Sequence, residues 1–539
     1  MARTVKRILC FFLISVFLTG CASGAAKTEK ALEEISALGT SPDDNYRTWY
    51  EIFVYSYCDS DGDGIGDLNG VTQKLPELQA LGITGIWLMP IHPSTTYHKY
   101  NVSDYYAIDP DYGTMEDFEN LLAACDDAGI KVILDLVVNH SGSEHAWFKE
   151  AVKYLQSLEA GEEPDAAACK YLDYYYFKPT AEVLGGWSQV TGTDYSYESK
   201  FSYDMPDLNL ASDAVRQEIR DIMQFWLDKG VAGFRLDAAK EFYSGSASKN
   251  IEVLSWLQKT AESIKPDVYM VAEVWDTFAT ITEYYESGVI SIFDYPFGNS
   301  DGKIVDVLRC TGNPAVVSTY ATALEKANKA YSASNGEYID APFLSNHDVG
   351  RIAGFVSGDE HKIKLAGAMN IFMSGSVFIY YGEEIGMPGS GNDPSKRAPM
   401  YWNKDRDEGT TDLPPECVLP KEYPLGSLEE QKKDADSVYN YYRQAIAIRN
   451  ALPVISHGVT TAEVSLNQGC VSAQRKTWND ESCIILMNVN GEAAEVDLSQ
   501  YEDWTLVSSL SADGKNVKLS GTTLKLPAYG IAILIPETV

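Results

Sequence analysis

Three carboxylates end apolar segments that lie far apart in the chain. Asp237 follows GFRL, Glu273 follows VYMVA, and Asp348 ends FLSNHD. Arg235 precedes Asp237 by two residues, so both side chains point to the same side of a strand. The sequence has no Ser-His-Asp order, no phosphate-binding loop and no HExxH motif. Paired carboxylates with few other nucleophiles are typical of enzymes that transfer a glycosyl group to water.

Eight apolar segments, rich in β-branched and aromatic residues, are spaced along the chain. They cover residues 48–57, 82–91, 131–140, 231–239, 268–275, 288–297, 341–348 and 376–384. Near-continuous apolar runs of this kind are typical of strands that are buried on both faces. Helical patterns lie between most of them. Eight strands alternating with helices predict an α/β fold, a (β/α)₈ TIM barrel.

Such a barrel would bring the candidate side chains together. Active groups of these barrels gather at the C-terminal ends of the strands. In this chain those ends carry Asp135, Asn139, His140, Arg235, Asp237, Glu273, His347 and Asp348. We therefore expect carboxylates, histidines and an arginine to meet at one barrel mouth. A satisfied buried polar group is the alternative for any one of them, but not for all of them together.

Two segments do not fit the alternation of strands and helices. About 70 residues, from Ser141 to Asn209, separate the third strand from the next helix, which is too long for a structureless loop. We expect residues 141–208 to form a small subdomain over the barrel mouth. Residues 454–539 alternate between apolar and polar positions, which predicts a C-terminal antiparallel β-sandwich domain. The catalytic barrel would then span residues 46–453.

Composition limits the classes of partner. The chain has 539 residues, too many for one ordinary core. Its formal net charge of −34 argues against nucleic acid and against electrostatic binding to anionic membranes. The 10 Trp and 34 Tyr residues fit either core packing or the stacking of sugar rings in a cleft. The cysteines are scattered without a CxxC pair, so we expect no disulfide framework and no zinc site.

The N-terminus has the pattern of an export signal. Basic residues precede an apolar segment, residues 8–18, that is too short to span a bilayer. This predicts a signal peptide over residues 1–20, which ends in a Leu-Thr-Gly-Cys stretch that resembles the lipobox of bacterial lipoproteins. Cys21 would then carry lipid and residues 21–45 would form a polar tether. We expect the protein on the extracellular face of the bacterial cell envelope, in contact with the membrane only through this anchor. A plain signal peptide cut nearby is the alternative.

Residues 59–67, DSDGDGIGD, have the spacing of a calcium loop. An EF-hand loop needs a glutamate at its twelfth position, where this chain has Gly70, and a strand-like segment precedes the loop. An EF-hand is therefore disfavoured. A free-standing Ca²⁺ loop is expected, because clustered carboxylates repel one another without a cation; a solvated acidic turn is the alternative. The candidate ligands are the carboxylates of Asp59, Asp61, Asp63 and Asp67 and the carbonyl of Ile65.

Four of the strand ends resemble the signature stretches of the α-amylase family of glycoside hydrolases. These are DLVVNH (135–140), GFRLDAAKE (233–241), AEVWD (272–276) and FLSNHD (343–348), in the order that the family has. MPDLN (205–209) resembles a fifth stretch. The resemblance covers roughly residues 46–539. It implies a barrel enzyme that hydrolyses α-glucosidic bonds with retention of configuration.

The resemblance assigns roles to the residues of the mouth. Asp237 would be the nucleophile, Glu273 the general acid and then the base, and Asp348 a group that binds sugar hydroxyls and favours ring distortion. Arg235 would hold the nucleophile ionised. The substrate-binding residues would be His98, Tyr100, His140, Arg235, Lys240 and His347, with Tyr100 stacking on the sugar.

The resemblance also bears on calcium. The loop at 59–67 is similar to a metal loop of a subset of the family, in which a structural Ca²⁺ would staple the first connection of the barrel. A second calcium site of the family uses the Asn of the first signature and a His in the second. Asn139 is present here, but Glu241 replaces the His, so a second calcium is left open.

Two positions favour a long α-1,4-glucan as substrate. Asn101 stands where members that release a single terminal glucose tend to have Asp, and Lys240 follows the amylase pattern. GEEIGM (382–387) and KRAPMYW (396–402) instead resemble stretches shared with α-glucosidases. We expect a monomer that hydrolyses α-1,4 bonds inside starch or maltodextrin at the cell surface. The alternatives are a neopullulanase-like or α-glucosidase activity on maltooligosaccharides, and a glucan-binding surface protein without catalysis.

Overall fold

Seven parallel strands form the central sheet of the computed structural model, which describes residues 24–159, 161–420 and 423–537. They are hydrogen-bonded in the order β10–β1–β2–β3–β7–β8–β9. Every residue of β1, β2, β7, β8 and β10 is buried, as expected for near-continuous apolar runs. The strands are β1 (Thr48–Ile52), β2 (Gly85–Leu88), β3 (Lys131–Leu136), β7 (Gly233–Leu236), β8 (Tyr269–Ala272), β9 (Ser291–Ile292) and β10 (Val377–Tyr380).

Residues 341–348, where the sequence predicted a strand, close the ring between β9 and β10. Ala341 forms a single parallel bridge with Phe293, and the Phe378 amide donates to the Pro342 carbonyl at 2.8 Å. The segment is not a regular strand, because Pro342 has no N–H with which to continue a ladder. With that correction, the (β/α)₈ barrel predicted from the sequence is confirmed.

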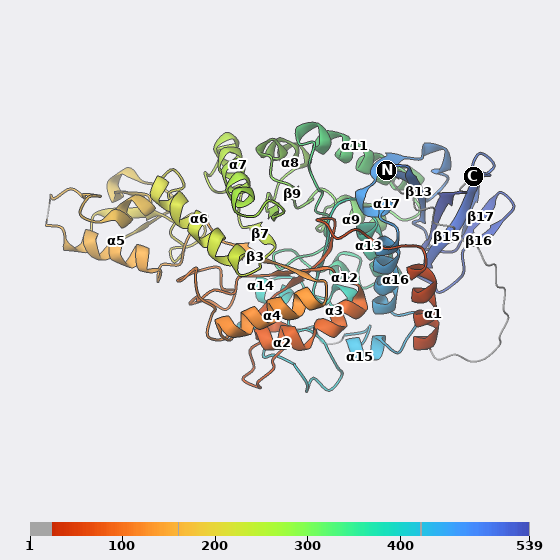
Figure 1. Cartoon of the computed structure of the whole chain (residues 1–539), viewed down its shortest axis with the longest axis horizontal. Helices are drawn as coiled ribbons and strands as arrows, with labels where there is room; N and C mark the ends of the chain where they lie inside the picture. Colours follow the sequence, from red (N-terminus) through yellow and green to blue (C-terminus); the bar gives the residue numbers. More distant parts are fainter. Residues whose placement is uncertain (1–23, 160, 421–422, 538–539) are drawn as a thin grey trace, which may run out of the picture.

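Helices cover the outside of the barrel (Figure 1). In α6 (Asp213–Asp228), Val215, Ile219 and Trp226 are buried on one face, which is the spacing of an amphipathic helix. Trp226 Nε1 also donates to the Tyr105 carbonyl at 2.8 Å. The other helices of this part of the chain are α2 (Leu68–Gln73), α3 (Leu75–Leu81), α4 (Met115–Asp127), α7 (Ala247–Ile264), α8 (Phe278–Tyr284), α9 (Lys303–Arg309), α10 (Pro314–Val317), α11 (Thr319–Ser334), α12 (Ile352–Phe355), α13 (Glu360–Ile371), α14 (Asp393–Lys396), α15 (Leu428–Gln431), α16 (Val438–Ala451) and α17 (Val454–His457).

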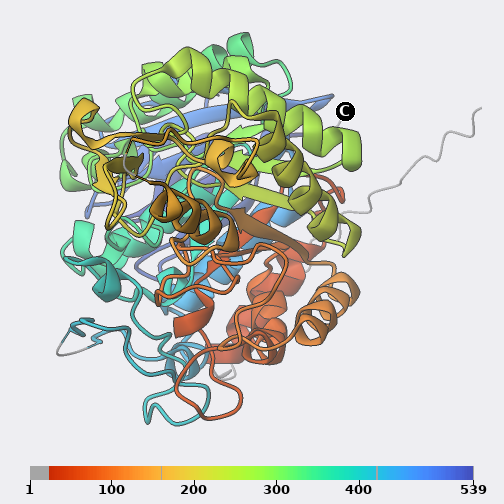
Figure 2. The same ribbon diagram turned by 90° about the vertical axis from the view of Figure 1, so that its left-hand side faces the viewer.

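The connection between β3 and α6 folds as a small unit of its own. It holds α5 (Ala146–Ser157) and an antiparallel sheet of β4 (Phe177–Pro179), β6 (Tyr195–Glu198) and β5 (Trp187–Gln189). A bridge between His140 and Asp207 ties it to the end of β3. Figure 1 shows the unit projecting to one side, and Figure 2, which looks from that side, shows it in front of the barrel strands. The subdomain predicted after the third strand is therefore present.

An antiparallel domain of two sheets follows α17. Leu486, Leu524 and Leu534, which come from both sheets, are buried in a core of their own. Along β17 the buried Leu524 alternates with the exposed Lys525. The alternation in the sequence therefore reflects a sheet with one face in the core and the other in solvent. The predicted β-sandwich is confirmed. One sheet contains β11 (Val459–Ala462), β12 (Val471–Trp478), β13 (Glu481–Asn488), β18 (Gly530–Pro536) and β15 (Trp504–Ser511), and the other contains β14 (Ala494–Asp497), β17 (Thr523–Leu526) and β16 (Lys518–Ser520).

Part of the expected tether is folded. Residues 24–36 form a helix, α1 (Gly24–Ser36), that packs on α16. Glu29 Oε1 lies 2.9 Å from Arg443 Nη1 of that helix, and Ile35 is buried. The expected tether is therefore helical and docked over residues 24–36. The expected signal peptide, residues 1–20, and Cys21 lie outside the described residues.

The position of α1 relative to the barrel follows from its neighbours. Leu32 and Ser36 line a cavity of about 660 Å³ together with Gly82 and Lys131. Gly82 precedes β2, and Lys131 begins β3. Helix α1 therefore lies at the N-terminal ends of the strands. Among the described residues, no helix combines the length and the apolar character needed to cross a membrane.

Candidate active site

The C-terminal ends of the strands border a cleft of about 820 Å³. The inserted subdomain contributes Phe201 and Met205 to its wall. Arg235 and His347 are each 1% exposed and lie directly behind the lining, in contact with it. The structure thus brings together every catalytic and substrate-binding residue predicted from the sequence. Those that line the cleft are His98, Tyr100, His140, Asp237, Lys240, Glu273 and Asp348.

Arg235 connects the carboxylates of the cleft. Its Nη1 donates to Asp237 Oδ1 at 2.6 Å and to Asp135 Oδ1 at 2.8 Å. Its Nη2 donates to Glu273 Oε2 at 2.8 Å. Because all three acceptors surround one buried guanidinium, Arg235 fixes the carboxyl groups of Asp237 and Glu273 relative to each other. Such a pair of neighbouring carboxyls is what a retaining glycosidase uses.

The backbone after Asp237 is strained, and its amide points at Glu273. Ala238 has a φ of 47°, a left-handed conformation that costs a non-glycine residue about 1–3 kcal/mol. In this conformation the Ala238 amide donates to Glu273 Oε2 at 2.9 Å. The next amide, of Ala239, donates to the Glu273 carbonyl at 3.1 Å. The strand ends that carry the two carboxylates are therefore joined directly.

Burial changes the acidity of both carboxyl groups. Burial raises the pKa of Glu273, and the negative charges of Asp237 and Asp348 act in the same direction against Arg235. Burial also raises the pKa of Asp237, with Arg235 as the largest opposing influence. Arg235 therefore favours the ionised form of Asp237, as expected from the sequence, but burial favours the protonated form. Two carboxyls that share one guanidinium favour a state with one proton between them, and a raised pKa suits Glu273 as a general acid.

A chain of hydrogen bonds lies under the floor of the cleft. His347 Nδ1 is bonded to Glu51 Oε1 at 2.6 Å. Nε2 of the same ring lies 2.9 Å from Asp348 Oδ2 and 2.8 Å from the Tyr100 hydroxyl. The Tyr100 hydroxyl donates to Asp135 Oδ2 at 3.0 Å, and the Tyr100 ring stacks on His347 with a centroid distance of 5.5 Å. His347 thereby fixes both the aromatic wall and the carboxylate of Asp348.

Asp348 is held in its ionised form. Burial favours the neutral acid, but His347 and Arg397 together hold the pKa of Asp348 well below its ordinary value. Arg397 Nη2 donates to Asp348 Oδ1 at 2.9 Å. In turn, Asp348 and Glu51 overcome burial and raise the pKa of His347 to about 9. At neutral pH a protonated imidazole therefore lies between the ionised Asp348 and Glu51.

Three further predicted residues border the cleft. His140 Nε2 is buried without a hydrogen-bond partner among the described residues, so it is available to a ligand in the cleft. Burial lowers the pKa of His98 and of His140 to about 4, which keeps both rings neutral. Lys240 Nζ donates to the Trp275 carbonyl and to Asp276 Oδ2, each at 3.0 Å. Lys240 thus braces the loop that follows Glu273.

Sequence reasoning did not assign three residues of the site, namely Glu51, Trp275 and Arg397. Arg397 lies in the KRAPMYW stretch and Trp275 in the AEVWD stretch, but neither had a role. Glu51 could have been found from its setting, because it is the charged residue inside the apolar strand TWYEI. A carboxylate buried in such a strand needs a partner.

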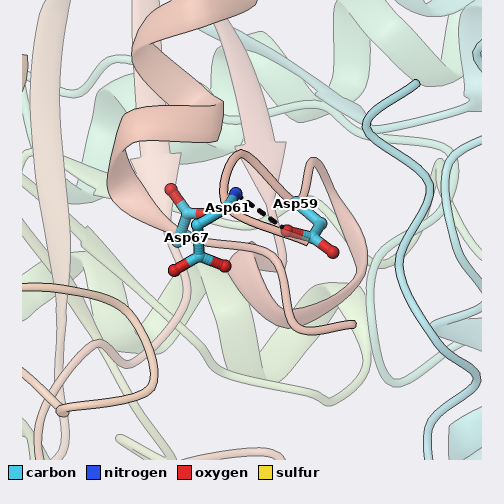
Figure 3. Close-up of side chains that lie close together, drawn as sticks. All are labelled: Asp59, Asp61 and Asp67. Carbon is cyan, nitrogen blue, oxygen red and sulfur yellow. Dashed lines mark hydrogen bonds between the residues drawn. The ribbon is translucent and has the colours of Figure 1, made fainter. Parts of the chain in front are cut away.

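The acidic loop before α2 gathers three of its four aspartates. Oxygen atoms of Asp59, Asp61 and Asp67 lie within 4.8 Å of one another. Figure 3 draws these three side chains. Asp63 is outside this group; its Oδ1 accepts a hydrogen bond from the Ile65 amide at 2.7 Å. Carboxylate oxygens clustered in this way are the hard ligands that Ca²⁺ takes. The donor set therefore fits the cation, with part of the predicted ligand set.

The second family calcium position has different contacts here. Asn139 Nδ2 donates to Asp207 Oδ1 at 3.2 Å. Glu241, which replaces the family's His, lies 3.5 Å from Lys200 Nζ, and the Lys200 amide donates to Asp207 Oδ2 at 3.0 Å. A lysine of this chain thus supplies positive charge beside the acidic residues of that position.

Known proteins resemble this chain over most of its length. Alpha-amylase 3 of Dictyoglomus thermophilum is 39% identical over 448 residues, 82% of this chain and 84% of that protein. The solved structure of Eubacterium rectale Amy13B is similar with a TM-score of 0.90 and 42% identity, over 94% of this chain and 99% of that one. A glucan 1,6-alpha-glucosidase of Streptococcus dysgalactiae subsp. equisimilis is 29% identical over 519 residues, 83% of this chain and 91% of that protein.

A family model agrees with these similarities and with the geometry of the cleft. Residues 51–458 match the family described as Alpha amylase, catalytic domain. This range contains the barrel from Glu51 in β1 onward, its inserted subdomain and the cluster of Arg235, Asp237, Glu273 and Asp348. The resemblance noted in the sequence is confirmed, and the chain belongs to the α-amylase family of glycoside hydrolases.

Proposed function

We propose that this protein hydrolyses α-1,4-glucosidic bonds inside starch or maltodextrin chains, with retention of configuration. The observation that carries the proposal is the hydrogen bonding of one buried guanidinium, that of Arg235, to both Asp237 and Glu273. Retaining enzymes keep their two carboxyl groups about 5–5.5 Å apart, a separation that a shared guanidinium spans. The similarity to Alpha-amylase 3 supports the choice of an α-glucan as substrate.

The reaction takes two steps at the same carbon. The Asp237 carboxylate attacks C1 of the sugar, and the bond from C1 to the glycosidic oxygen breaks as Glu273 gives its proton to that oxygen. Glu273 then takes a proton from a water molecule, which attacks C1 and releases Asp237. Both displacements invert C1, so the product keeps the α configuration.

The remaining polar groups bind the sugar that reacts. Asp348, ionised beside His347 and Arg397, accepts hydrogen bonds from sugar hydroxyls. His140 supplies a neutral ring nitrogen without another partner in the described structure. Contacts of this kind accelerate the reaction where they strengthen in the transition state.

An α-glucosidase that removes terminal units is the second candidate. The observation that favours it is the position of Arg397, which lines the cleft and donates to Asp348. Its long side chain takes up space beside the sugar site and would shorten the room for a polymer there. Product analysis on starch, pullulan and maltose separates the candidates. Mixed maltooligosaccharides from starch, released first as α-anomers, support internal cleavage. Glucose as the only early product supports the glucosidase, panose from pullulan supports a neopullulanase-like activity, and β-anomers contradict retention.

The proposal includes a structural Ca²⁺ and a cell-surface location. Asp59, Asp61 and Asp67 would hold the cation next to the start of α2, where Asp67 Oδ1 also accepts from the Gly70 amide at 2.7 Å. The lipobox-like Leu-Thr-Gly-Cys stretch supports lipid attachment at Cys21. A monomer anchored in this way would meet its polymer outside the cell.

A further inference from the structure

A buried lysine separates two residues that line the active-site cleft. His98 and Tyr100 border the cavity, whereas Lys99, which stands between them, is only 3% exposed. Lys99 has a φ of 64°, a left-handed conformation that is uncommon for residues other than glycine. Its two neighbours thus face the cleft, while the Lys99 side chain points behind the wall.

Two aspartates hold the ammonium group behind the wall. Lys99 Nζ lies 2.8 Å from Asp109 Oδ2 and 2.8 Å from Asp111 Oδ2. The side chains of Lys99 and Asp109 are each only 4% exposed, and the centroid of the Tyr112 ring lies 5.2 Å from Nζ. A buried ammonium ion is tolerated only where charged and hydrogen-bonded partners surround it. The ion pair therefore fixes the end of the Lys99 side chain.

Asp109 also closes the loop that ends at Lys99. Its Oδ2, the oxygen beside Lys99 Nζ, accepts a hydrogen bond from the Ser94 amide at 3.1 Å. The Asp109 amide donates to the carbonyl of Ile91, in the segment that follows β2, at 2.8 Å. Residues 94–99 are thus held at both ends by one carboxylate oxygen, and the residue that supplies it is bonded to the end of a barrel strand.

We propose that Lys99 is a positioning residue, whose buried ion pair holds Tyr100 and His98 against the sugar that reacts. Tyr100 follows Lys99 directly, so a movement of the Lys99 backbone shifts the Tyr100 ring. That ring stacks on His347 with a centroid distance of 5.5 Å. The Tyr100 amide donates to His98 Nδ1 at 3.2 Å, which couples the two side chains. The inference rests on the proposed function, which gives Lys99 no role.

The test compares Lys99→Met with Lys364→Met as a matched control. Methionine keeps an unbranched side chain of similar length and removes the charge. Lys364 is also 3% exposed, and its Nζ lies 2.7 Å from Glu360 Oε1, but it stands in α13 and is not among the described residues that line the cleft. Both variants lose a buried ion pair and should melt at a lower temperature than wild type.

Activity separates the two variants. At a temperature where both are folded, kcat/KM on maltoheptaose should fall about tenfold or more for Lys99→Met, because a small displacement of groups that contact the reacting sugar is costly. Lys364→Met should stay near wild type. Equal losses for the two variants, or no loss for Lys99→Met, would overturn the proposal.

A double-mutant cycle tests whether Lys99 acts through Tyr100. In a Tyr100→Ala background, Lys99→Met should lower kcat/KM by at most about threefold, because the two effects are coupled. Asp109→Asn is a milder second variant, since Asp111 remains as a partner of the ammonium group, and its loss should also shrink in that background. It gives the same comparison if Lys99→Met does not fold. A loss of the same size in both backgrounds would overturn the proposal.

Maltoheptaose also separates this inference from the proposed function. If wild type does not cleave it, the proposed function fails, and calorimetry of the same sugar with the two methionine variants decides the inference. Weaker binding to Lys99→Met than to Lys364→Met supports the positioning role, because Tyr100 and His98 line the cleft in which the sugar would bind. Equal binding contradicts it.

Discussion

His347 Nδ1 lies 2.6 Å from Glu51 Oε1, although 296 residues separate the two in the chain. Glu51 stands in β1, and His347 precedes Asp348 at the mouth. The contact places a buried negative charge behind the imidazole that orders Asp348 and Tyr100. Glu51 is thus a positioning residue: it acts on the substrate through His347.

The charge of Glu51 should appear in the pH dependence of catalysis. The pKa of His347 is raised to about 9. The protonated ring therefore holds Asp348 and Tyr100 in place fully below about pH 6.5, and this effect is lost as the pH rises through about 9. Glu51→Gln keeps an acceptor for Nδ1 but lowers this pKa. The ratio of kcat/KM for Glu51→Gln to that of wild type should fall about tenfold between pH 5.5 and 8.5.

Glu384→Gln is the control for that experiment. Glu384 is another buried glutamate of the barrel, and its Oε1 accepts from the Tyr50 hydroxyl at 2.7 Å. It makes no hydrogen bond to His347, and burial raises its own pKa to about 7, so any change in its ratio should follow a titration near pH 7 and leave the loss of activity near pH 9 as in wild type. A pH-independent ratio for Glu51→Gln would mean that Glu51 acts only in packing.

Asp237→Asn should abolish hydrolysis and leave the fold intact. The amide oxygen can still accept from Arg235, but the amide cannot form a glycosyl ester. We expect kcat on starch to fall roughly 10⁴-fold or more with a melting temperature close to wild type. Turnover near the wild-type value would contradict the role of nucleophile.

Glu273→Gln should lose activity in a way that depends on the leaving group. Starch needs a proton on the departing oxygen, so kcat/KM should fall by about 10²–10⁴-fold. Fluoride departs with little help from an acid, so the loss on α-maltotriosyl fluoride should be much smaller. Asp237→Asn should lose both activities. Equal losses for Glu273→Gln on the two substrates would argue against general acid catalysis by this residue.

Removal of calcium should lower the stability of the protein, with little effect on turnover while it remains folded. Bound Ca²⁺ stabilises the native state by mass action, and the loop that holds Asp59, Asp61 and Asp67 contributes no residue to the lining of the active-site cleft. Melting curves with chelator and with added Ca²⁺ measure the effect. Asp61→Ala should melt lower and lose its response to Ca²⁺. Asp63→Ala, outside the carboxylate group, should keep most of that response; an equal loss would show that Asp63 is a ligand as the sequence predicted.

Cys21→Ser should prevent lipid attachment and leave catalysis unchanged. Fractionation of cells grown with a labelled fatty acid should find the label in wild type and not in the variant. Purified protein that begins at Gly24 retains α1 and the barrel, so it should cleave soluble starch at the wild-type rate. Wild type that never takes up label, or that remains in the cytoplasm, would contradict the anchor.

The residues of the catalytic mouth were predictable because the direction of a side chain on a strand follows from its position in the local sequence. Arg235 and Asp237 had to share a face because side chains alternate along a strand. For Glu51, the apolar strand around it indicates that a partner is needed, but only the closed barrel shows that the partner is His347. The seventh predicted strand, residues 341–348, is irregular because Pro342 has no N–H for the hydrogen-bond ladder, although the segment is apolar. Asp63 illustrates a smaller limit: its spacing in the sequence does not reveal that its carboxylate lies outside the group formed by Asp59, Asp61 and Asp67.

The N-terminal segment shows why composition alone does not separate a coil from a helix. GAAKTEKALEEIS is rich in Ala, Glu and Lys, residues that are common in linkers and are also good helix formers. A short helix is marginal in water without tertiary contacts. Packing on α16 and the ion pair of Glu29 with Arg443 supply those contacts.

Helix α1 lies at the N-terminal ends of the strands, and the catalytic cleft opens at the other ends. A lipid three residues before Gly24 would therefore anchor the enzyme by the face of the barrel opposite the cleft. Because α1 packs on α16, only a short segment would separate the bilayer from the barrel. The mouth would then face the medium, where a starch granule arrives from outside and no chain has to thread beneath the enzyme.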